Sequence, residues 1–226
     1  MIDLKVLCEG ATEEQLVKTL IGPHLYTRGG IYCTPIQVTT KADYRTSKQY
    51  KGGVKNYQPV IRDIRKLLRS TQADLRLTTC LDLYALPKDF PGNTEHDPQE
   101  AVYDRVARLE EALATDVNDS RFYPYFSVHE LEALVLVKPQ LLLERFPQYK
   151  RSIRQLLKEL GDSPNPELIN GAPSTCPARR IQRACPNYTK TADGISLLQA
   201  IGLSTLRTRC PHFDNWLTHL ENLVPV

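Results

Sequence analysis

Apolar side chains in the first 138 residues follow two kinds of spacing, which are short runs rich in apolar residues but mixed with polar ones, and positions three or four residues apart. The runs predict strands, and the spaced positions predict amphipathic helices between them. The predicted strands cover residues 2–8, 31–38, 75–82 and 121–127, and the predicted helices begin near Glu13 or cover residues 57–70, 99–115 and 129–137. Because strands and helices alternate, we expect an α/β fold with a mainly parallel four-stranded sheet flanked by helices.

The rest of the chain has a different pattern. After residue 138 no strand is predicted, and short helical segments are broken by Pro and Gly. We therefore expect a core domain at residues 1–138 and a helical extension at residues 139–226 that packs on it. Within the core, residues 39–56 and 84–98 lack periodic apolar positions and are predicted to be loops.

Composition is that of an ordinary globular protein, with 41% hydrophobic and 24% charged residues. The longest apolar runs are short and interrupted by charge, so no membrane-spanning segment and no membrane partner are expected. The N-terminal sequence MIDLKVLCEG has too few apolar residues for a signal peptide, so a cytoplasmic location with reduced thiols is expected.

A zinc site formed by cysteines and His212 stays open at this point. Three of the six cysteines are followed by Pro, but no C-x-x-C pair is present, and packed thiols are favoured. The cysteines that would form the zinc site are Cys176, Cys185 and Cys210.

Acidic residues follow the ends of three predicted strands. Glu9 ends the first strand, Asp82 ends the third, and Glu130 and Glu132 come after the fourth. Ligands of open parallel sheets bind at the carboxyl ends of the strands, so we expect these acids to converge. Carboxylates at close range repel one another, and Mg²⁺ or Mn²⁺ would neutralise them. At most one of Glu130 and Glu132 should reach the metal, because residues two apart on a helix point in different directions, and Glu130 is favoured.

Glu13 is a further candidate ligand. Gly10 permits a sharp turn after Glu9, and the first turn of the next helix would direct Glu13 back toward Glu9. The alternative is that Glu13 and Glu14 only complement the helix dipole. Asp82 has a similar alternative as a turn or helix cap.

Cationic residues are concentrated between residues 41 and 69, where Tyr44, Tyr50 and Tyr57 are interleaved with them. This combination is typical of segments that bind phosphates and stack on unpaired bases, although a solvated surface is the common alternative. A second cluster of arginines follows residue 178. The residues predicted to bind nucleic acid are Lys48, Lys51, Lys55, Arg62, Arg179 and Arg180.

Several motifs occur in an order that resembles a known family. They are C-E-G-A-T-E-E at 8–14, Asp82, F-S-V-H-E-L-E-A-L at 126–134, P-E-L-I-N-G-A-P at 166–173, and I-G-L followed by R-T-R-C-P-H-F-D-N-W within 201–216. The chain resembles Toprim-fold proteins. It resembles more closely a family of small prokaryotic Toprim-like proteins of unknown function. That family is related to the nucleases of the overcoming-lysogenization-defect (OLD) type and is encoded beside ATPases in defence and mobile-element loci.

The resemblance implies a Toprim-like core with a metal site for phosphodiester chemistry. It assigns Glu9 as the Toprim glutamate and Glu13 as the second acid of E-G-x-T-E. Asp82 would be the first aspartate of the Toprim D-x-D pair, and Tyr84 stands where the second aspartate would be.

The missing second aspartate puts a standard two-metal site in doubt, and the resemblance leaves Glu130 or Asp89 as substitutes. It also implies a basic residue that stabilises the transition state. Lys190, in Y-T-K at 188–190, is the candidate for this residue.

These observations predict a metal-dependent nuclease that acts on DNA or RNA. Its predicted catalytic residues are Glu9, Asp82 and Lys190, and its predicted metal ligands are Glu9, Glu13, Asp82 and Glu130. The resemblance implies control by a separately encoded ATPase in a defence system, and a homo-oligomer stays open. The alternatives are a primase-like nucleotidyl transferase and a non-catalytic module that binds nucleic acid or an ATPase.

Overall fold

The chain divides into two compact units in the computed structural model. The first unit is Met1–Ser127 with Thr218–Val226, and the second unit is Val128–Leu217. The predicted boundary after residue 138 differs from this division. Residues 128–138 were predicted in the core but belong to the second unit, and residues 218–226 were predicted in the extension but belong to the first unit. The structure describes residues 1–43, 48–51, 53–84, 86–94, 99–128, 130–161, 165–169 and 175–224.

The first unit is built on a parallel sheet. Its strand order is β2 (Tyr32–Gln37), β1 (Asp3–Cys8), β5 (Leu75–Asp82) and β6 (Phe122–Tyr123), and β7 (Phe126–Ser127) also pairs with β5. Every one of these pairings is parallel. The predicted α/β class with a mainly parallel sheet is thereby confirmed.

β5 is the central strand and is covered on both faces. Its residues are buried from Leu75 to Leu81, and Asp82 is the first residue of the strand to become partly exposed. Burial on both faces includes polar side chains, because Arg76, Thr78 and Thr79 are buried together with the apolar residues of the strand. The first point at which the strand reaches solvent is therefore its carboxyl end.

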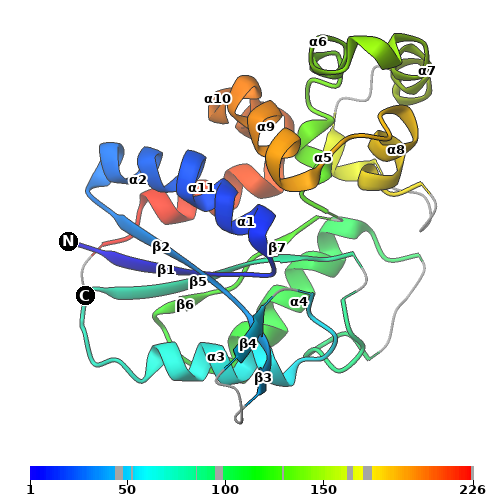
Figure 1. Cartoon of the computed structure of the whole chain (residues 1–226). Coiled ribbons are helices and arrows are strands. Elements are labelled where there is room, and N and C mark those ends of the chain that lie inside the picture. Colours follow the sequence, from blue (N-terminus) through cyan, green and yellow to red (C-terminus); the bar gives the residue numbers. More distant parts are fainter. Residues whose placement is uncertain are drawn as a thin grey trace. The chain divides into compact units, whose positions relative to one another are not determined.

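Helices cover both faces of this sheet (Figure 1). α1 (Ala11–Leu16), the π-helical turn η1 (Val17–Ile21) and α2 (Gly22–Gly29) follow β1 and lie on one face. α3 (Gln58–Leu68) and α4 (Val102–Val117) lie on the other face.

Most of the buried positions of α3 and α4 follow the apolar spacing of the sequence, and Asp63 of α3 is buried in addition. The apolar ones include Val60 and Ile64 in α3, and Val106, Leu109 and Leu113 in α4. The helix boundaries agree with the predicted ranges to within three residues at each end.

The predicted strand at 121–127 is two short strands. β6 pairs with Leu77 and Thr78, and β7 pairs with Leu81 and Asp82, so the ladder is interrupted between them. Pro124 lies in the interruption. The Thr79 hydroxyl replaces the missing pairing, because it donates to the Tyr125 carbonyl at 2.8 Å and accepts from the Tyr125 N–H at 2.7 Å.

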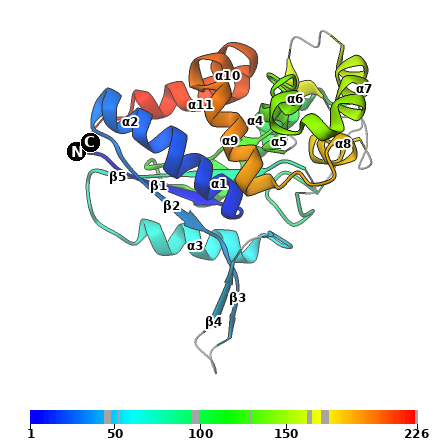
Figure 2. The same ribbon diagram turned by 45° about the horizontal axis from the view of Figure 1, so that its top comes forward.

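The predicted loop at 39–56 was wrong in part. β3 (Thr39–Asp43) and β4 (Lys48–Lys51) form a separate antiparallel pair that extends away from the main sheet (Figure 2). Pairing between backbone groups requires no apolar face, so the apolar pattern gave no signal for these strands. Asp63 of α3 holds the start of β3, because its carboxylate accepts from the Thr39 N–H at 2.8 Å.

The end of the chain belongs to the first unit. The ring of His219 stacks on Tyr123 with 3.6 Å between centroids. Glu221 lies 2.6 Å from His24 of α2, and the Arg76 side chain donates to the Val224 carbonyl at 2.6 Å. These contacts join residues more than 90 positions apart, which the local sequence pattern does not predict.

Where it is described, the second unit is helical, as predicted for most of it. Its helices are α5 (Glu132–Val135), α6 (Leu141–Arg145), η2 (Pro147–Tyr149), α7 (Lys150–Leu160), η3 (Pro166–Leu168), α8 (Pro177–Ala184), η4 (Lys190–Gly194), α9 (Ile195–Ile201), α10 (Leu203–Arg209) and most of α11 (Pro211–Glu221). Phe213 and Trp216 are among its buried side chains.

The helix predicted at 129–137 is reduced to the four residues of α5. The flanking residues make tighter turns, such as Ala133 N–H to the Glu130 carbonyl and Val137 N–H to the Leu134 carbonyl. Residues 131–137 are all buried, so no polar face was available to show where the helix ends. Within the described ranges, no helix is both long enough and apolar enough to cross a bilayer.

We predict that Thr79→Val lowers the free energy of unfolding by about 1–3 kcal/mol, since it leaves both backbone groups of Tyr125 buried without their partner. Valine has nearly the shape of threonine, so packing is retained. Urea unfolding followed by fluorescence measures the change, and Thr79→Ser, which keeps the hydroxyl, is the control. Equal stability of Thr79→Val and the wild type would contradict the bridging role.

Candidate functional site

Glu9 and Asp82 lie at the ends of two neighbouring strands. β1 and β5 run in parallel register up to Cys8 opposite Cys80. The Glu9 N–H donates to the Cys80 carbonyl at 3.1 Å, which continues the ladder one residue beyond β1. The Asp82 N–H in turn donates to Oε2 of Glu9 at 3.2 Å. The two acids at the predicted strand ends are therefore brought together at the carboxyl edge of the sheet.

Glu13 lies on the first turn of α1 and folds back toward the same edge. Its Oε2 accepts from the Gly10 N–H at 2.9 Å, and only 7% of the residue is exposed. This contact is the half of a capping box in which the side chain at N3 reaches back to the N-cap N–H, since glycine has no side chain with which to form the other half. Glu14 instead contacts Lys18 and Gln37 through its carboxylate. Glu13 is thus the one of this pair that faces inward.

The negative charges at this edge act on two buried thiols. Burial raises the pKa of Cys80 well above its usual value, and the charges of Glu13, Asp82 and Glu9 raise it further. Burial likewise raises the pKa of Cys8, with added effects of Glu13 and Glu14. Three carboxylates therefore contribute to the electrostatic potential at one buried thiol.

A small hollow lies beside the two acids. Glu9, Asp82 and Tyr84 contribute to its wall, together with Val54 and apolar side chains of the segment that follows β5. Tyr84 thus borders the acids at the position where the resemblance would place a second aspartate. Asp89, a suggested substitute, instead accepts the Tyr57 N–H at 2.9 Å before α3.

The donor set at this edge fits a hard divalent cation. Glu9 and Asp82 offer carboxylate oxygens, and Mg²⁺ binds proteins through one or two carboxylates while it keeps water ligands. In the described part of the chain, no three His, Cys, Asp or Glu side chains are arranged as a metal site. The edge therefore offers the carboxylates of Glu9 and Asp82, and Glu13, a predicted ligand, does not join them in a three-residue group among the described residues.

Lys190 and two buried glutamates form a cluster in the second unit. Lys190 Nζ lies 3.2 Å from Oε2 of Glu132 and 3.8 Å from Oε1 of Glu130. Glu130 and Glu132 are 6% and 2% exposed. Oε2 of Glu130 also accepts from the Ala178 N–H at 3.1 Å, at the start of α8. Glu130, a predicted metal ligand, and Lys190, a predicted catalytic residue, are therefore ion-paired with each other.

This cluster is electrostatically strained. Burial raises the pKa of Glu132; the nearby Lys190 opposes this rise, and the Glu130 charge adds to it. Oε1 of Glu132 and the hydroxyl of Tyr188 are buried and have no hydrogen-bond partner among the described residues. Burial also raises the pKa of Tyr188, and the charge of Glu132 adds to this effect. Buried polar groups without partners are uncommon and concentrate at functional sites.

The predicted nucleic-acid contacts have different surroundings. Lys55 is exposed just after β4, whereas the side chains of Lys48 and Lys51 lie outside the described residues. The Arg62 guanidinium is 3.1 Å from Asp63 and also donates to the Thr39 carbonyl, so it joins α3 to β3. Arg62 therefore has a structural role that the sequence did not indicate.

In the second unit, Arg179 is exposed and Arg180 is partly exposed. Nε of Arg180 donates to the Thr175 carbonyl at 2.5 Å. His129, considered as a general base, lies outside the described residues.

All six cysteines are free. Cys176, Cys185 and Cys210 are buried, and burial is the main cause that raises the pKa of each of their thiols. The His212 N–H donates to Glu167 at 3.0 Å. The zinc site considered from the sequence does not form among the described residues.

Comparison with protein-family models identifies the family of this chain. Residues 8–221 match the model of a family described as "Domain of unknown function (DUF4276)". The chain belongs to this DUF4276 family. No protein with a curated description matches it.

Solved structures of one other protein are similar to this DUF4276 chain. One is the C-terminal region of the OLD protein of Xanthomonas campestris pv. campestris phased with platinum, with 16% identity over 96% of this chain and 94% of that chain and a TM-score of 0.43. The same region phased with mercury has 15% identity over 96% of both chains and a TM-score of 0.41. At this identity the likeness assigns no activity to this chain.

We predict that Lys190→Met destabilises the protein in a pH-dependent way. The loss should be about 2 kcal/mol at pH 7.5, less than for a fully buried pair because the Lys190 side chain is 42% exposed. Without the ammonium, the pKa of Glu132 rises further, so the folded protein binds its proton more tightly than the unfolded chain does. The loss should therefore grow as pH rises above the ordinary glutamate pKa and shrink in acid.

Urea unfolding at pH 5 and pH 7.5 measures this effect. Lys158→Met removes an exposed cation of α7 and is the control. An equal loss of stability at both pH values would contradict the role of Lys190 in neutralising the two glutamates.

Proposed function

We propose that this chain is a metal-dependent nuclease that hydrolyses phosphodiester bonds of DNA or RNA at the carboxyl edge of the first-unit sheet. The observation that carries the proposal is the contact between the Asp82 N–H and the Glu9 carboxylate at 3.2 Å. This contact fixes two acids side by side where β1 and β5 end. A bound phosphate needs charge neutralisation at such a place, and two carboxylates are sufficient to hold Mg²⁺ or Mn²⁺.

Each residue of the edge would have a distinct task. Glu9 and Asp82 would hold the ion, and the Asp82 N–H would fix the orientation of Glu9. When bound, the ion would lower the pKa of the attacking water and offset phosphate charge. Tyr84 lines the same hollow, from which its hydroxyl would donate a hydrogen bond to a phosphate oxygen.

The segment after the β3–β4 hairpin connects this edge with the cationic stretch. Val54 lines the hollow that contains Glu9 and Asp82, and the next residue, Lys55, is exposed. A strand with one phosphate at the acids would therefore pass close to Lys55. Contacts between lysines and phosphates position a strand without reading its sequence.

Three parts of the proposal rest on the resemblance of the motifs. They are a transition-state role for Lys190, a defence function, and control by a separately encoded ATPase. The chain has no G-x-x-x-x-G-K-[ST] motif, so ATP hydrolysis by a P-loop would have to come from such a partner.

We predict that Glu9→Gln abolishes cleavage and leaves the fold intact. Glutamine keeps an oxygen that can accept the Asp82 N–H, but a neutral amide is a poor ligand for a hard cation. Loss of the ion removes several kcal/mol of transition-state stabilisation. Labelled DNA and RNA are incubated with Mg²⁺ or Mn²⁺, and thermal unfolding is recorded in parallel. Glu14→Gln, which alters the acid that faces Lys18 and Gln37, is the matched control.

Cleavage by Glu9→Gln at the wild-type rate would sink the catalytic assignment. If the wild-type protein cleaves none of the nucleic acids tested, the result favours the non-catalytic binding module. Incorporation of labelled nucleoside triphosphates without cleavage would favour the nucleotidyl transferase.

We predict that joint replacement of Lys48, Lys51 and Lys55 by Ala weakens binding while cleavage at saturating substrate is retained. The slope of log affinity against log salt should become less steep by about one unit for each phosphate that the variant no longer binds. Fluorescence anisotropy across a salt series measures this slope. Replacement of Lys66 and Arg69, exposed residues near the end of α3, is the control. An unchanged slope in the triple variant would exclude the hairpin as a phosphate-binding element.

A further inference from the structure

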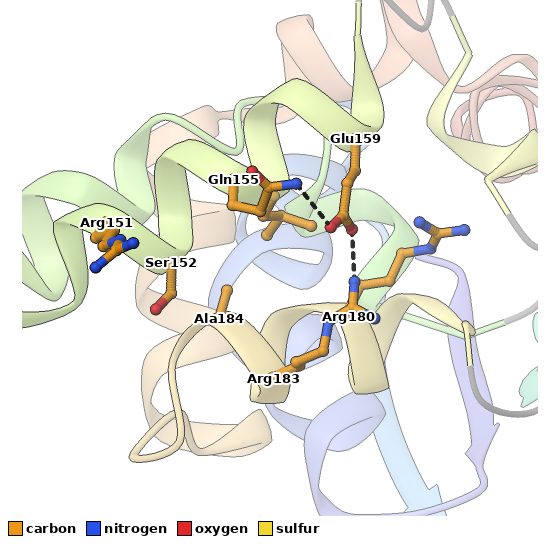
Figure 3. A pocket seen from close by; sticks show the side chains of 8 residues that line it. Arg151, Ser152, Gln155, Glu159, Arg180, Arg183 and Ala184 are labelled. Carbon is orange, nitrogen blue, oxygen red and sulfur yellow. Dashed lines mark hydrogen bonds and ion pairs between the residues drawn. The ribbon is translucent and has the colours of Figure 1, made fainter.

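A groove separates α7 from α8 within the second unit. Figure 3 shows the side chains that line it. Arg151, Ser152 and Gln155 reach it from α7, and Arg180 and Arg183 reach it from α8. Leu156 and Ala184 contribute apolar atoms and Glu159 contributes an acid, so the lining of the groove is mixed, with three cationic side chains and one acidic side chain.

These two helices are much more basic than the chain as a whole. α7 (Lys150–Leu160) and α8 (Pro177–Ala184) carry seven cationic side chains and one acidic side chain, whereas the whole chain has a net charge of only +3. The cations outside the groove lining are Lys150, Arg154, Lys158 and Arg179, and all four are exposed. An excess of this size on neighbouring helices creates a local positive potential.

The single acid of the two helices offsets only one of the groove arginines. Glu159 accepts from Arg183 at 2.5 Å and from Gln155 at 3.3 Å (Figure 3). Arg180 is held differently, because its Nε donates to the Thr175 carbonyl at 2.5 Å. That bond holds the Arg180 side chain at the groove. A ligand that binds Arg180 therefore costs less side-chain conformational entropy. A merely solvated arginine would have no such anchor.

We infer that this groove binds the phosphate backbone of a nucleic acid. The inference rests on the proposed function, since it gives the proposed nuclease a second contact with its substrate, in addition to the acids of the first unit. All cations that line the groove are arginines, whose planar guanidinium matches two phosphate oxygens at once. α7 is about 16 Å long, which spans several consecutive phosphates of one strand.

The lining favours a nucleic-acid backbone over an acidic protein partner. It contains no aromatic side chain among the described residues, and buried aromatic anchors dominate the binding energy of most protein interfaces. The same feature argues against stacking on bases. Binding in the groove therefore depends on charge and strand geometry and is independent of base sequence.

The test compares the groove arginines with an arginine beside the groove. Arg151→Ala with Arg180→Ala removes two groove cations, and Arg154→Ala removes an exposed cation of α7 that does not line it. The full chain is titrated into fluorescent single-stranded DNA, single-stranded RNA and duplex DNA in EDTA, across a salt series. We expect the double variant to bind at least one of these about tenfold more weakly and to have a salt slope about two units less steep, with Arg154→Ala close to wild type.

Three results would overturn the inference. The first is a double variant with the affinity and salt slope of the wild type, and the second is an equal loss of affinity in Arg154→Ala. The third is binding that depends on Arg151 and Arg180 only when the ligand is a labelled poly-glutamate peptide, which would identify an acidic protein partner instead. If the double variant fails to fold by thermal unfolding, Arg151→Ala alone decides, since Arg151 is exposed and should still cost about threefold in affinity.

The binding assay also separates this inference from the proposed nuclease. No cleavage occurs in EDTA, so the groove can be confirmed while the catalytic test on Glu9 fails. Conversely, Glu9-dependent cleavage can be confirmed while the groove variants bind normally.

Discussion

The central position of β5 is the constraint on which the candidate site depends. The strand is buried on both faces up to Leu81, where the charged Arg76 is satisfied by backbone carbonyls, so an acid that is to meet a ligand has its place where the strand emerges. Asp82 occupies that point, and parallel pairing with β1 brings Glu9 to the same level. The Asp82 N–H then bonds to the Glu9 carboxylate, because the ladder has run out of backbone acceptors there. The position of the candidate site at this edge therefore follows from the burial of β5 on both of its faces.

The second unit has a different electrostatic problem. Glu130 and Glu132 are buried beside one ammonium, which leaves the cluster with an excess of negative charge. Such an arrangement costs stability unless a proton or a further cation completes it. On α7 and α8 of the same unit the excess is positive, and it lies at the surface, where water and counterions screen it. The glutamate cluster and the cationic surface of α7 and α8 thus differ in burial more than in their number of charges.

The sequence predicted the sheet and the paired acids because both follow from local patterns. The segment 75–82, rich in apolar and β-branched residues, was recognised as a strand, and Glu9 and Asp82 could be placed at strand ends without any knowledge of contacts. The hairpin at 39–51 could not be predicted this way, because its strands pair through backbone groups and carry no apolar alternation. The role of Arg62 was missed for a related reason, since its partners come from two elements that meet only in the fold.

Proline occupies both edges of the main sheet. Pro35 lies in β2, opposite Val6, and Pro124 separates β6 from β7 at the other edge. Each proline removes one N–H from the row of groups that a further strand would need for pairing. The sheet is therefore poorly suited to grow by edge-to-edge addition, which protects the protein from this route to aggregation. Assembly of several copies by edge-to-edge pairing of the main sheet is therefore disfavoured.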